Sequence, residues 1–271
     1  MNKFSVIMPV YYKEEPERLR LAILSLIEQT LLPDEIVVVL DGPVGESLNK
    51  VLKEFDHLNF IKVIRLKENL GVGMARKTAI SEAKYNILAL MDSDDISYKN
   101  RFKLQIKEII NKRAQVVGGW IEEFSSSPGD LKVIRKLPIN HDEIYKFGKW
   151  RMPVNNVTLM FTREVYDAAG GYTEQTKSED WNLFVRLITT GAKFYNVPEV
   201  LVYARAGEDM ILRRRGWTQI ITQLSIFPLM YKMKYIGFYH LFLNIFIRIN
   251  LRFLPAGVTS YLYKKVLREN L

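Results

Sequence analysis

The chain has 271 residues, a net charge of +9 and no cysteine. This length fits one large domain or one domain with an extension, and a hydrophobic content of 48% allows a sizeable core. The absence of cysteine excludes disulfides and thiolate metal sites and is compatible with a reducing compartment. We expect neither a signal peptide nor a membrane-spanning helix, because no charged leader opens the sequence and no apolar stretch reaches about 18 uncharged residues.

The charge is distributed unevenly along the chain. Residues 211–271 contain ten Lys or Arg and a single acidic residue, Glu269, whereas residues 1–210 contain 29 basic and 29 acidic residues. All of the excess positive charge therefore belongs to the last 61 residues. This asymmetry predicts an acidic surface as the partner of that segment.

The first 95 residues alternate between short apolar runs and amphipathic segments. Buried strands are predicted at 4–10, 35–40, 60–66 and 87–91. Helices are predicted from Pro16, over 46–56 and over 71–84. This alternation is typical of βαβ units with a parallel sheet, in which ligands bind at the carboxyl ends of the strands. Polar loops follow at those ends, and the helix that begins at Gly71 offers its N-terminus to an anion.

The fourth strand runs directly into Asp92, Ser93, Asp94 and Asp95. Alternation along the chain places Asp92 and Asp94 on one side and Asp95 on the other. Two carboxylates on one side suit a divalent cation such as Mg²⁺, which takes its remaining ligands from substrate phosphates. The alternative is an Asp-rich turn that only ends the strand.

The second half has a looser pattern. Helices are predicted at 100–112, 141–148, 163–169 and 178–187, and strands at 115–120 and 157–161. In the last helix, Asp180 shares a face with Phe184 and Leu187 and heads the stripe that should face the core. The alternative for Glu179 and Asp180 is that they only complement the helix dipole.

The ordered set of motifs resembles family 2 glycosyltransferases over residues 3–205. The resemblance implies the GT-A fold, an α/β fold with a Rossmann-like nucleotide-binding half at 1–95 and an acceptor half at 96–210. It also implies transfer of a sugar from a UDP-sugar or another nucleotide-sugar with inversion, assisted by Mg²⁺ or Mn²⁺. The motifs are PVYYKE at 9–14, LDG at 40–42, ENLGVGMAR at 68–76, LMDSDD at 90–95, GGY at 170–172 and SEDWNLFVRL at 178–187.

The resemblance also implies roles for individual residues. Asp180 matches the catalytic base of the family, and Glu179 would contact the acceptor. Asp92 and Asp94 match the DXD motif, with Asp94 on the metal and Asp92 on the metal or the ribose. The remaining donor-binding residues would be Pro9, Val10, Tyr11, Asp41, Asn69, Arg76 and Ser93, of which Tyr11, Asp41 and Arg76 would hold the base and ribose.

The sequence departs from the family pattern at three points. The usual Asp-Asp-Gly-Ser is Leu40-Asp41-Gly42-Pro43, and the usual Arg-Asn is Arg76-Lys77. The Gln-x-x-Arg-Trp motif of processive members is absent, and residues 213–217 only echo it. The absence favours addition of a single sugar.

The segment 211–271 interleaves aromatic and basic residues, which suits helices that lie in the membrane interface and bind anionic lipid. A cytoplasmic enzyme held peripherally on the inner face of a bacterial membrane would suit a polyprenyl-diphosphate-linked glycan acceptor, as relatives use for O-antigen, capsule or exopolysaccharide. The alternative is that these helices pack on the catalytic domain with a solvated basic face.

Three other functions fit parts of the sequence. A dinucleotide-binding dehydrogenase fits poorly, because Asn69 to Gly73 lacks the third glycine of that motif. A nucleotidyltransferase usually carries a Gly-rich basic loop after its first strand, where this chain has Tyr11 to Glu15. A catalytically silent glycan- or lipid-binding protein would not need both Asp94 and Asp180. No nucleic-acid partner is expected, because no nucleic-acid-binding motif occurs.

Overall fold

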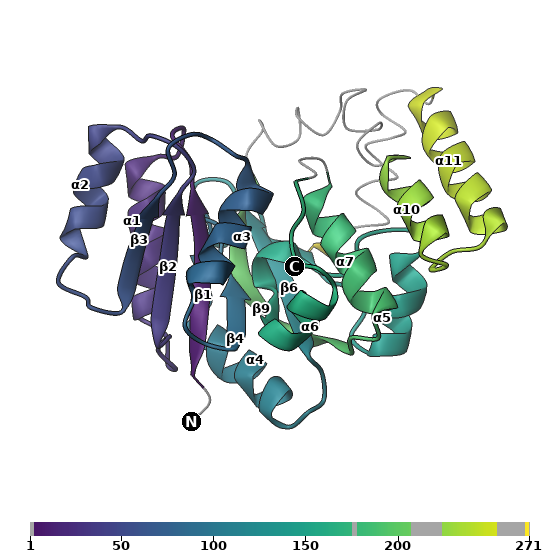
Figure 1. Ribbon diagram of the computed structural model, residues 1–271, viewed down its shortest axis with the longest axis horizontal. Helices are drawn as coiled ribbons and strands as arrows, with labels where there is room; N and C mark the ends of the chain where they lie inside the picture. Colours follow the sequence, from purple (N-terminus) through teal and green to yellow (C-terminus); the bar gives the residue numbers. More distant parts are fainter. Residues whose placement is uncertain (1–2, 175–177, 207–223, 254–268, 271) are drawn as a thin grey trace.

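The computed structural model describes residues 3–174, 178–206, 224–253 and 269–270. Its first part pairs β1 in parallel with β2 and β4, and β2 in parallel with β3. The predicted parallel βαβ half is therefore confirmed (Figure 1). Its elements are β1 (Phe4–Val10), α1 (Pro16–Ile27), β2 (Glu35–Leu40), α2 (Glu46–Glu54), β3 (Ile61–Arg65), α3 (Val72–Glu82) and β4 (Ile87–Leu90).

The second part adds mostly antiparallel strands to the same sheet. β8 pairs with both β4 and β6, so the two parts of the chain share one continuous sheet. The strand predicted at 157–161 begins only at Met160, because the residues Asn156–Thr158 form a 3-10 helix. The elements are β5 (Ile96–Ser97), α4 (Arg101–Ile110), β6 (Val116–Phe124), β7 (Val133–Arg135), α5 (His141–Gly148), η1 (Asn156–Thr158), β8 (Met160–Thr162), α6 (Arg163–Ala168), α7 (Glu179–Thr189) and β9 (Phe194–Arg205).

The longest strand, β9, is absent from the sequence-based prediction. Its run of apolar residues is interrupted by Pro198 and Glu199. The structure accommodates them with register shifts against β6 on either side of Trp120, as a β-bulge does. With β10 (Glu269–Asn270) at one edge, the strand order is β10-β7-β6-β8-β4-β1-β2-β3, and β9 lies beside β6 and β5.

Two apolar cores fill the two sides of the sheet. Residues such as Val6 and Met8 of β1 face α1, α2 and α4 on one side. The alternate residue Ile7 faces α3, α6 and α7 on the other side, as the two-residue period of a strand requires. Because α3 and α7 share this second face, their N-terminal turns meet: a Cβ on Gly73 would lie 3.3 Å from the Cβ of Glu179.

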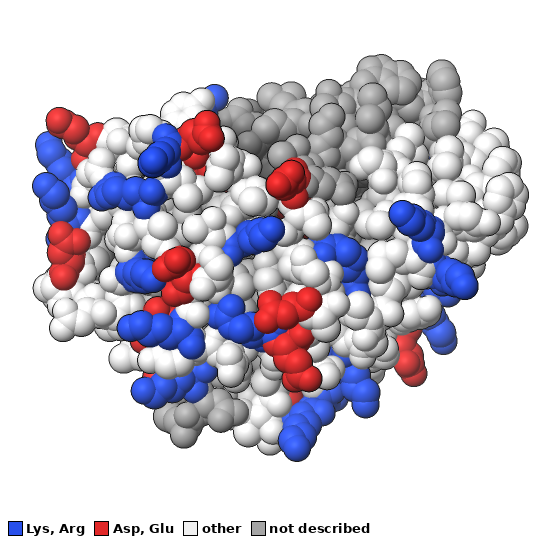
Figure 2. Space-filling model, in the orientation of Figure 1, with Lys and Arg blue, Asp and Glu red and all other residues white. Residues whose placement is uncertain are grey.

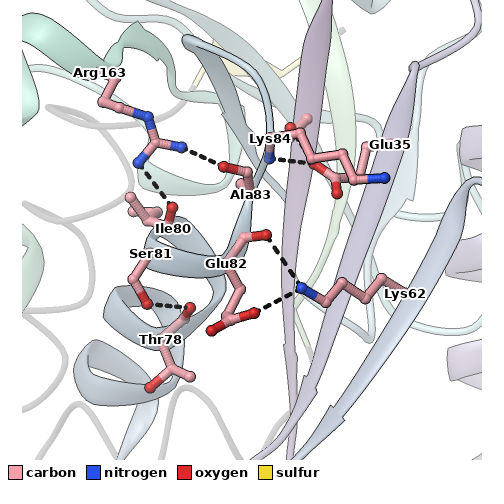
Figure 3. A network of polar contacts seen from close by, with 10 residues as sticks. Glu35, Lys62, Thr78, Ile80, Ser81, Glu82, Ala83, Lys84 and Arg163 are labelled. Atoms are coloured by element: carbon pink, nitrogen blue, oxygen red, sulfur yellow. Dashed lines mark hydrogen bonds and ion pairs between the residues drawn. The ribbon is translucent and has the colours of Figure 1, made fainter.

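The C-terminal end of α3 is tied down from both sides (Figure 3). Arg163 donates from Nη1 to the carbonyl of Ile80 and from Nη2 to the carbonyl of Ala83, both at 2.8 Å. Lys62 of β3 donates to the Glu82 carboxylate at 2.6 Å. Arg163 thus supplies hydrogen-bond donors to carbonyls at the end of α3, where few intrahelical partners remain, and the Lys62–Glu82 ion pair adds a second anchor.

The two described helices of the tail, α10 (Ile226–Lys232) and α11 (Phe238–Phe253), pack on the preceding part of the chain. Phe227 is fully buried, with its ring 5.7 Å from that of Trp181. The Tyr235 hydroxyl donates to the Tyr145 carbonyl at 2.7 Å and closely approaches Gly148. α10 thus belongs to the core. None of the helices in the described ranges has the length and apolar character needed to cross a membrane. Residues 211–223, 254–268 and 271 of the predicted tail lie outside the described residues.

If α10 is part of the folded core, Phe227→Ala should lower the free energy of unfolding by about 3–5 kcal/mol, the usual cost of removing a buried Phe. The measurement is urea denaturation followed by circular dichroism. Tyr231→Ala on the same helix is the matched control, because Tyr231 is 47% exposed; it should cost less than about 0.5 kcal/mol. An equally small decrease in the free energy of unfolding for both variants would contradict the packing of α10 in the core.

Candidate active site

A cavity of about 1000 Å³ opens at the carboxyl ends of β1, β2 and β4. This is the edge at which parallel sheets bind their ligands. All eleven donor, metal, acceptor and catalytic residues expected from the sequence line it. The lining consists of Pro9, Val10, Tyr11, Lys13, Glu14, Glu15, Arg18, Asp41, Asn69, Gly71, Val72, Arg76, Asp92, Ser93, Asp94, Glu179 and Asp180.

The acidic turn after β4 divides its carboxylates as expected. Asp92 and Asp94 line the cavity, whereas Asp95 is buried and accepts a hydrogen bond from the backbone N–H of Arg205 at 2.7 Å. Burial and the neighbouring carboxylates raise the pKa of Asp95 well above its usual range. Arg205 also donates from Nε to the Asp94 carbonyl at 3.2 Å, so the end of β9 holds the turn in place.

Arg76 bridges two carboxylates that belong to distant segments. Its Nη2 donates to Asp92 Oδ1 at 2.6 Å, and its Nη1 donates to Asp180 Oδ1 at 2.8 Å. The Arg76 side chain is only 3% exposed, whereas the side chains of Asp92 and Asp180 are each 34% exposed to the cavity. Burial alone would lower the pKa of Arg76, but these carboxylates hold it well above its ordinary value.

Asp180 stands in the first turn of α7, facing the start of α3. Burial raises the pKa of its carboxyl to about 7, against the lowering effect of Arg76 and with a further rise from Glu179 and Asp92. Asp180 is therefore engaged with the cavity and with Arg76, which goes beyond complementing the helix dipole. A carboxylate with a pKa near neutrality suits proton transfer at neutral pH.

Asp41 organises the loop that opens α3. Its carboxylate accepts the backbone N–H of Leu70 at 2.7 Å and that of Gly71 at 3.0 Å, and the Asn69 side chain donates to its carbonyl at 3.1 Å. Gly42 has a φ of +90°, and a Cβ there would lie 2.9 Å from the Asn69 nitrogen. Only glycine fits this close approach, which explains the glycine of the Leu-Asp-Gly sequence. Asp41 and Asn69 thus shape the cavity wall through the backbone.

Asp94 has the surroundings of a cation ligand. Burial, Asp92 and Glu14 raise the pKa of its carboxyl to about 6. Within the described ranges, no group of three or more His, Asp or Glu has the arrangement of a complete metal site. Two protein carboxylates with open positions for diphosphate oxygens are nevertheless the usual arrangement for Mg²⁺, so the donor set fits such an ion.

Several residues of the site were not singled out from the sequence. Glu14 accepts a short hydrogen bond from the Ser93 hydroxyl, which joins the loop after β1 to the acidic turn. Arg101 lies beneath that turn, donates to the Leu90 carbonyl at 2.6 Å and has its pKa lowered to about 9 by burial. The position of Glu14 after a buried strand is a usable signal. Nothing local distinguishes Arg101 from a surface arginine.

Comparison with known proteins now identifies the family. Residues 5–169 match the model of Glycosyl transferase family 2. The chain belongs to this family. Family 2 relatives include the amylovoran biosynthesis glycosyltransferase AmsE of Erwinia amylovora, which is 35% identical over 97% of this chain and 98% of its own length. The glycosyltransferase activity expected from the motifs is thereby confirmed.

Another family 2 relative is the Escherichia coli UDP-Gal:alpha-D-GlcNAc-diphosphoundecaprenol beta-1,3-galactosyltransferase, 33% identical over 98% of this chain and 97% of that protein. Among solved structures, S. aureus TarS 1-349 in complex with UDP-GlcNAc aligns with a TM-score of 0.67 and 19% identity, covering 97% of this chain and 76% of TarS 1-349. This similarity supports the family 2 fold, and the expected GT-A architecture is confirmed.

The raised pKa of Asp94 predicts an effect on stability. Its ionised form is disfavoured in the fold, so the cost is present above about pH 6 and disappears as the pH falls towards the ordinary pKa of 3.8. In EDTA at pH 8, Asp94→Asn should raise the free energy of unfolding by on the order of 1–3 kcal/mol, and the gain should vanish by about pH 4. Urea denaturation at both pH values measures it.

The matched control is Asp130→Asn, which should lower the free energy of unfolding at pH 8 instead of raising it. Three backbone N–H groups, those of Ser125, Ser126 and Ser127, donate to the Asp130 carboxylate and lower its pKa. The ionised Asp130 carboxylate therefore stabilises the fold at neutral pH and loses this effect in acid, so Asp130→Asn should be less stable than the wild type at pH 8. A loss of stability with Asp94→Asn at pH 8 would refute the proposed electrostatic environment of Asp94.

Proposed function

We propose that this family 2 glycosyltransferase transfers one sugar, with inversion, from a UDP-sugar to a lipid-linked glycan acceptor in surface polysaccharide biosynthesis. The observation that carries the proposal is the convergence of Asp92, Asp94 and Asp180 on one cavity of about 1000 Å³. A donor side and an acceptor side of the reaction can both be assigned within it.

The donor side lies at Asp92 and Asp94, which would hold Mg²⁺ or Mn²⁺. When bound, the cation would neutralise the charge that develops on the leaving diphosphate. Tyr11 and the loop shaped by Asp41 and Asn69 form the wall against which the nucleoside would lie. The N-terminus of α3, which opens at Gly71 beside the cavity, adds the partial positive charge that favours a phosphate group.

The acceptor side lies at Asp180 and Glu179. The acceptor hydroxyl must lose a proton as it attacks, and an ionised Asp180 carboxylate within about 2.6–3.2 Å can take it. Attack from the face opposite the leaving diphosphate inverts the anomeric carbon, so one base suffices and no covalent nucleophile is needed. The named substrates of the E. coli galactosyltransferase, UDP-Gal and a GlcNAc-diphosphoundecaprenol, support the choice of donor and acceptor class.

The experiment measures UDP release from UDP-galactose and UDP-N-acetylglucosamine with a synthetic GlcNAc-diphosphate-lipid acceptor, in Mn²⁺ or EDTA. We expect turnover only with the metal. Asp180→Asn should retain UDP affinity within about threefold and lose about 10²- to 10⁴-fold in kcat, the usual contribution of a general base. Asp94→Asn should abolish the metal-dependent part of UDP binding.

Asp130→Asn, in an exposed loop away from the cavity lining, is the control and should leave turnover unchanged. Unchanged turnover with Asp180→Asn would remove that residue as the base. An absence of metal-stimulated UDP release with every common UDP-sugar would favour the alternative of a catalytically silent binding protein.

The proposal includes peripheral attachment to an anionic membrane through α11. Phe238, Phe242 and Phe246 recur every fourth residue along one face and are 70%, 57% and 53% exposed, and the adjacent Tyr239 is 69% exposed. Monomeric proteins rarely expose contiguous apolar surface of this kind without a partner. Figure 2 presents α11 as an almost uncharged surface, with Lys and Arg side chains along its lower border.

The opposite face of α11 is fixed to the domain. Asn244 donates to the Lys149 carbonyl at 3.1 Å, and Arg248 donates to the Trp150 carbonyl at 2.6 Å. The aromatic row of Phe238, Phe242 and Phe246 therefore points away from the domain. An uncharged aromatic row bordered by basic residues is the composition of an interfacial helix on anionic lipid, and the positive C-terminal segment adds attraction.

Phe242→Ser with Phe246→Ser should weaken binding to vesicles of phosphatidylglycerol and phosphatidylethanolamine by at least about tenfold, since partial burial of two Phe rings exceeds the 1.4 kcal/mol of a tenfold change. Vesicle flotation measures it. Leu32→Ser is the matched control, because Leu32 is also 53% exposed but lies in the loop between α1 and β2, outside the tail. Flotation of the double variant that equals the wild type would refute the membrane contact. The contact would also be refuted if sedimentation showed that the wild type is a dimer and that the double variant is not, because the aromatic row would then be a dimer interface.

A further inference from the structure

The resemblance to family 2 implies that Arg76 holds the base and ribose of the nucleotide. In the structure both Nη atoms donate to carboxylates, one on each side of the proposed reaction. We infer that Arg76 is the positioning residue of the catalytic base, holding the Asp180 carboxylate at a set distance from the donor-side Asp92. The inference rests on the proposed function, in which Asp180 is the base.

The first support is the geometry at Asp180. Arg76 Nη1 donates a hydrogen bond to Asp180 Oδ1 at 2.8 Å. Within the described residues, no hydrogen bond to Asp180 Oδ2 is found. The carboxylate lines the cavity, so the second oxygen is available to an acceptor hydroxyl. A base that is oriented by a third group through its other atom is the general arrangement by which enzymes hold proton acceptors in position.

The second support is the burial and rigidity of Arg76. Its position follows from α3, whose C-terminal end is tied down by Arg163 and Lys62. Its guanidinium lies 6.0 Å from the ring centroid of Tyr172, which is itself fully buried. A buried arginine with few alternative rotamers fixes its partners more firmly than an exposed arginine would.

The third support is the forked shape of the side chain. Asp92 follows β4 and Asp180 lies in α7, and one planar guanidinium spans them with two N–H groups at 2.6 and 2.8 Å. A lysine ammonium is a single point charge and cannot reproduce this two-sided geometry. Arg76 therefore sets the separation between the donor and acceptor sides as well as the direction of the base.

The test is a double-mutant cycle in UDP release with the GlcNAc-diphosphate-lipid acceptor. Arg76→Lys should lower kcat by about 10- to 100-fold, because misplacement of a catalytic group by about 1 Å has an effect of that size, while the Kd for UDP changes less than about threefold. In the Asp180→Asn background the same substitution should lower kcat by less than about threefold, because the base that it positions is already absent.

Lys77→Met on the exposed side of α3 is the control and should leave kcat and UDP binding unchanged. Binding of UDP by calorimetry, together with thermal unfolding, verifies that each variant is folded, and Arg76→Gln provides a second variant if Arg76→Lys unfolds. A change confined to the Kd for UDP, or an additive cycle with Asp180→Asn, would overturn the inference and return Arg76 to the nucleotide. An inactive wild type would instead overturn the proposed function.

Discussion

The two ion pairs of Arg76 join segments that are 16 and 104 residues apart in the chain. Carboxylates in a shared cavity repel one another, and burial raises the pKa of both Asp94 and Asp180. A buried guanidinium between Asp92 and Asp180 offsets part of this repulsion and is itself tolerable only because it is paired. The geometry of the cavity depends on this contact.

The fold provides the support that this contact requires. α3 and α7 pack on the same face of the sheet, and the missing side chain of Gly73 lets their first turns approach closely. The far end of α3 is anchored by Arg163 and Lys62 (Figure 3). α3 is therefore anchored at its C-terminal end. Near its N-terminal end it carries Arg76, which contacts the two carboxylates.

The C-terminal helices combine two roles in a short segment. α10 inserts Phe227 beside Trp181, the residue that follows Asp180, so the tail buttresses the helix that carries the proposed base. α11 is attached by Asn244 and Arg248 and leaves its aromatic row outward. Membrane attachment and the active site would therefore be mechanically linked through α7.

The amino-acid sequence alone determined the strands β1, β2, β3 and β4 and the acidic turn after β4, because these follow from local periodicity and from residues adjacent in the chain. It also indicated Asp180, through its place at the head of an apolar stripe and its resemblance to a family motif. Only the tertiary structure decided the partners of Arg76, the burial of α10 and the course of β9 around its bulge. These depend on which distant segments pack together, and composition and spacing carry no direct record of that packing.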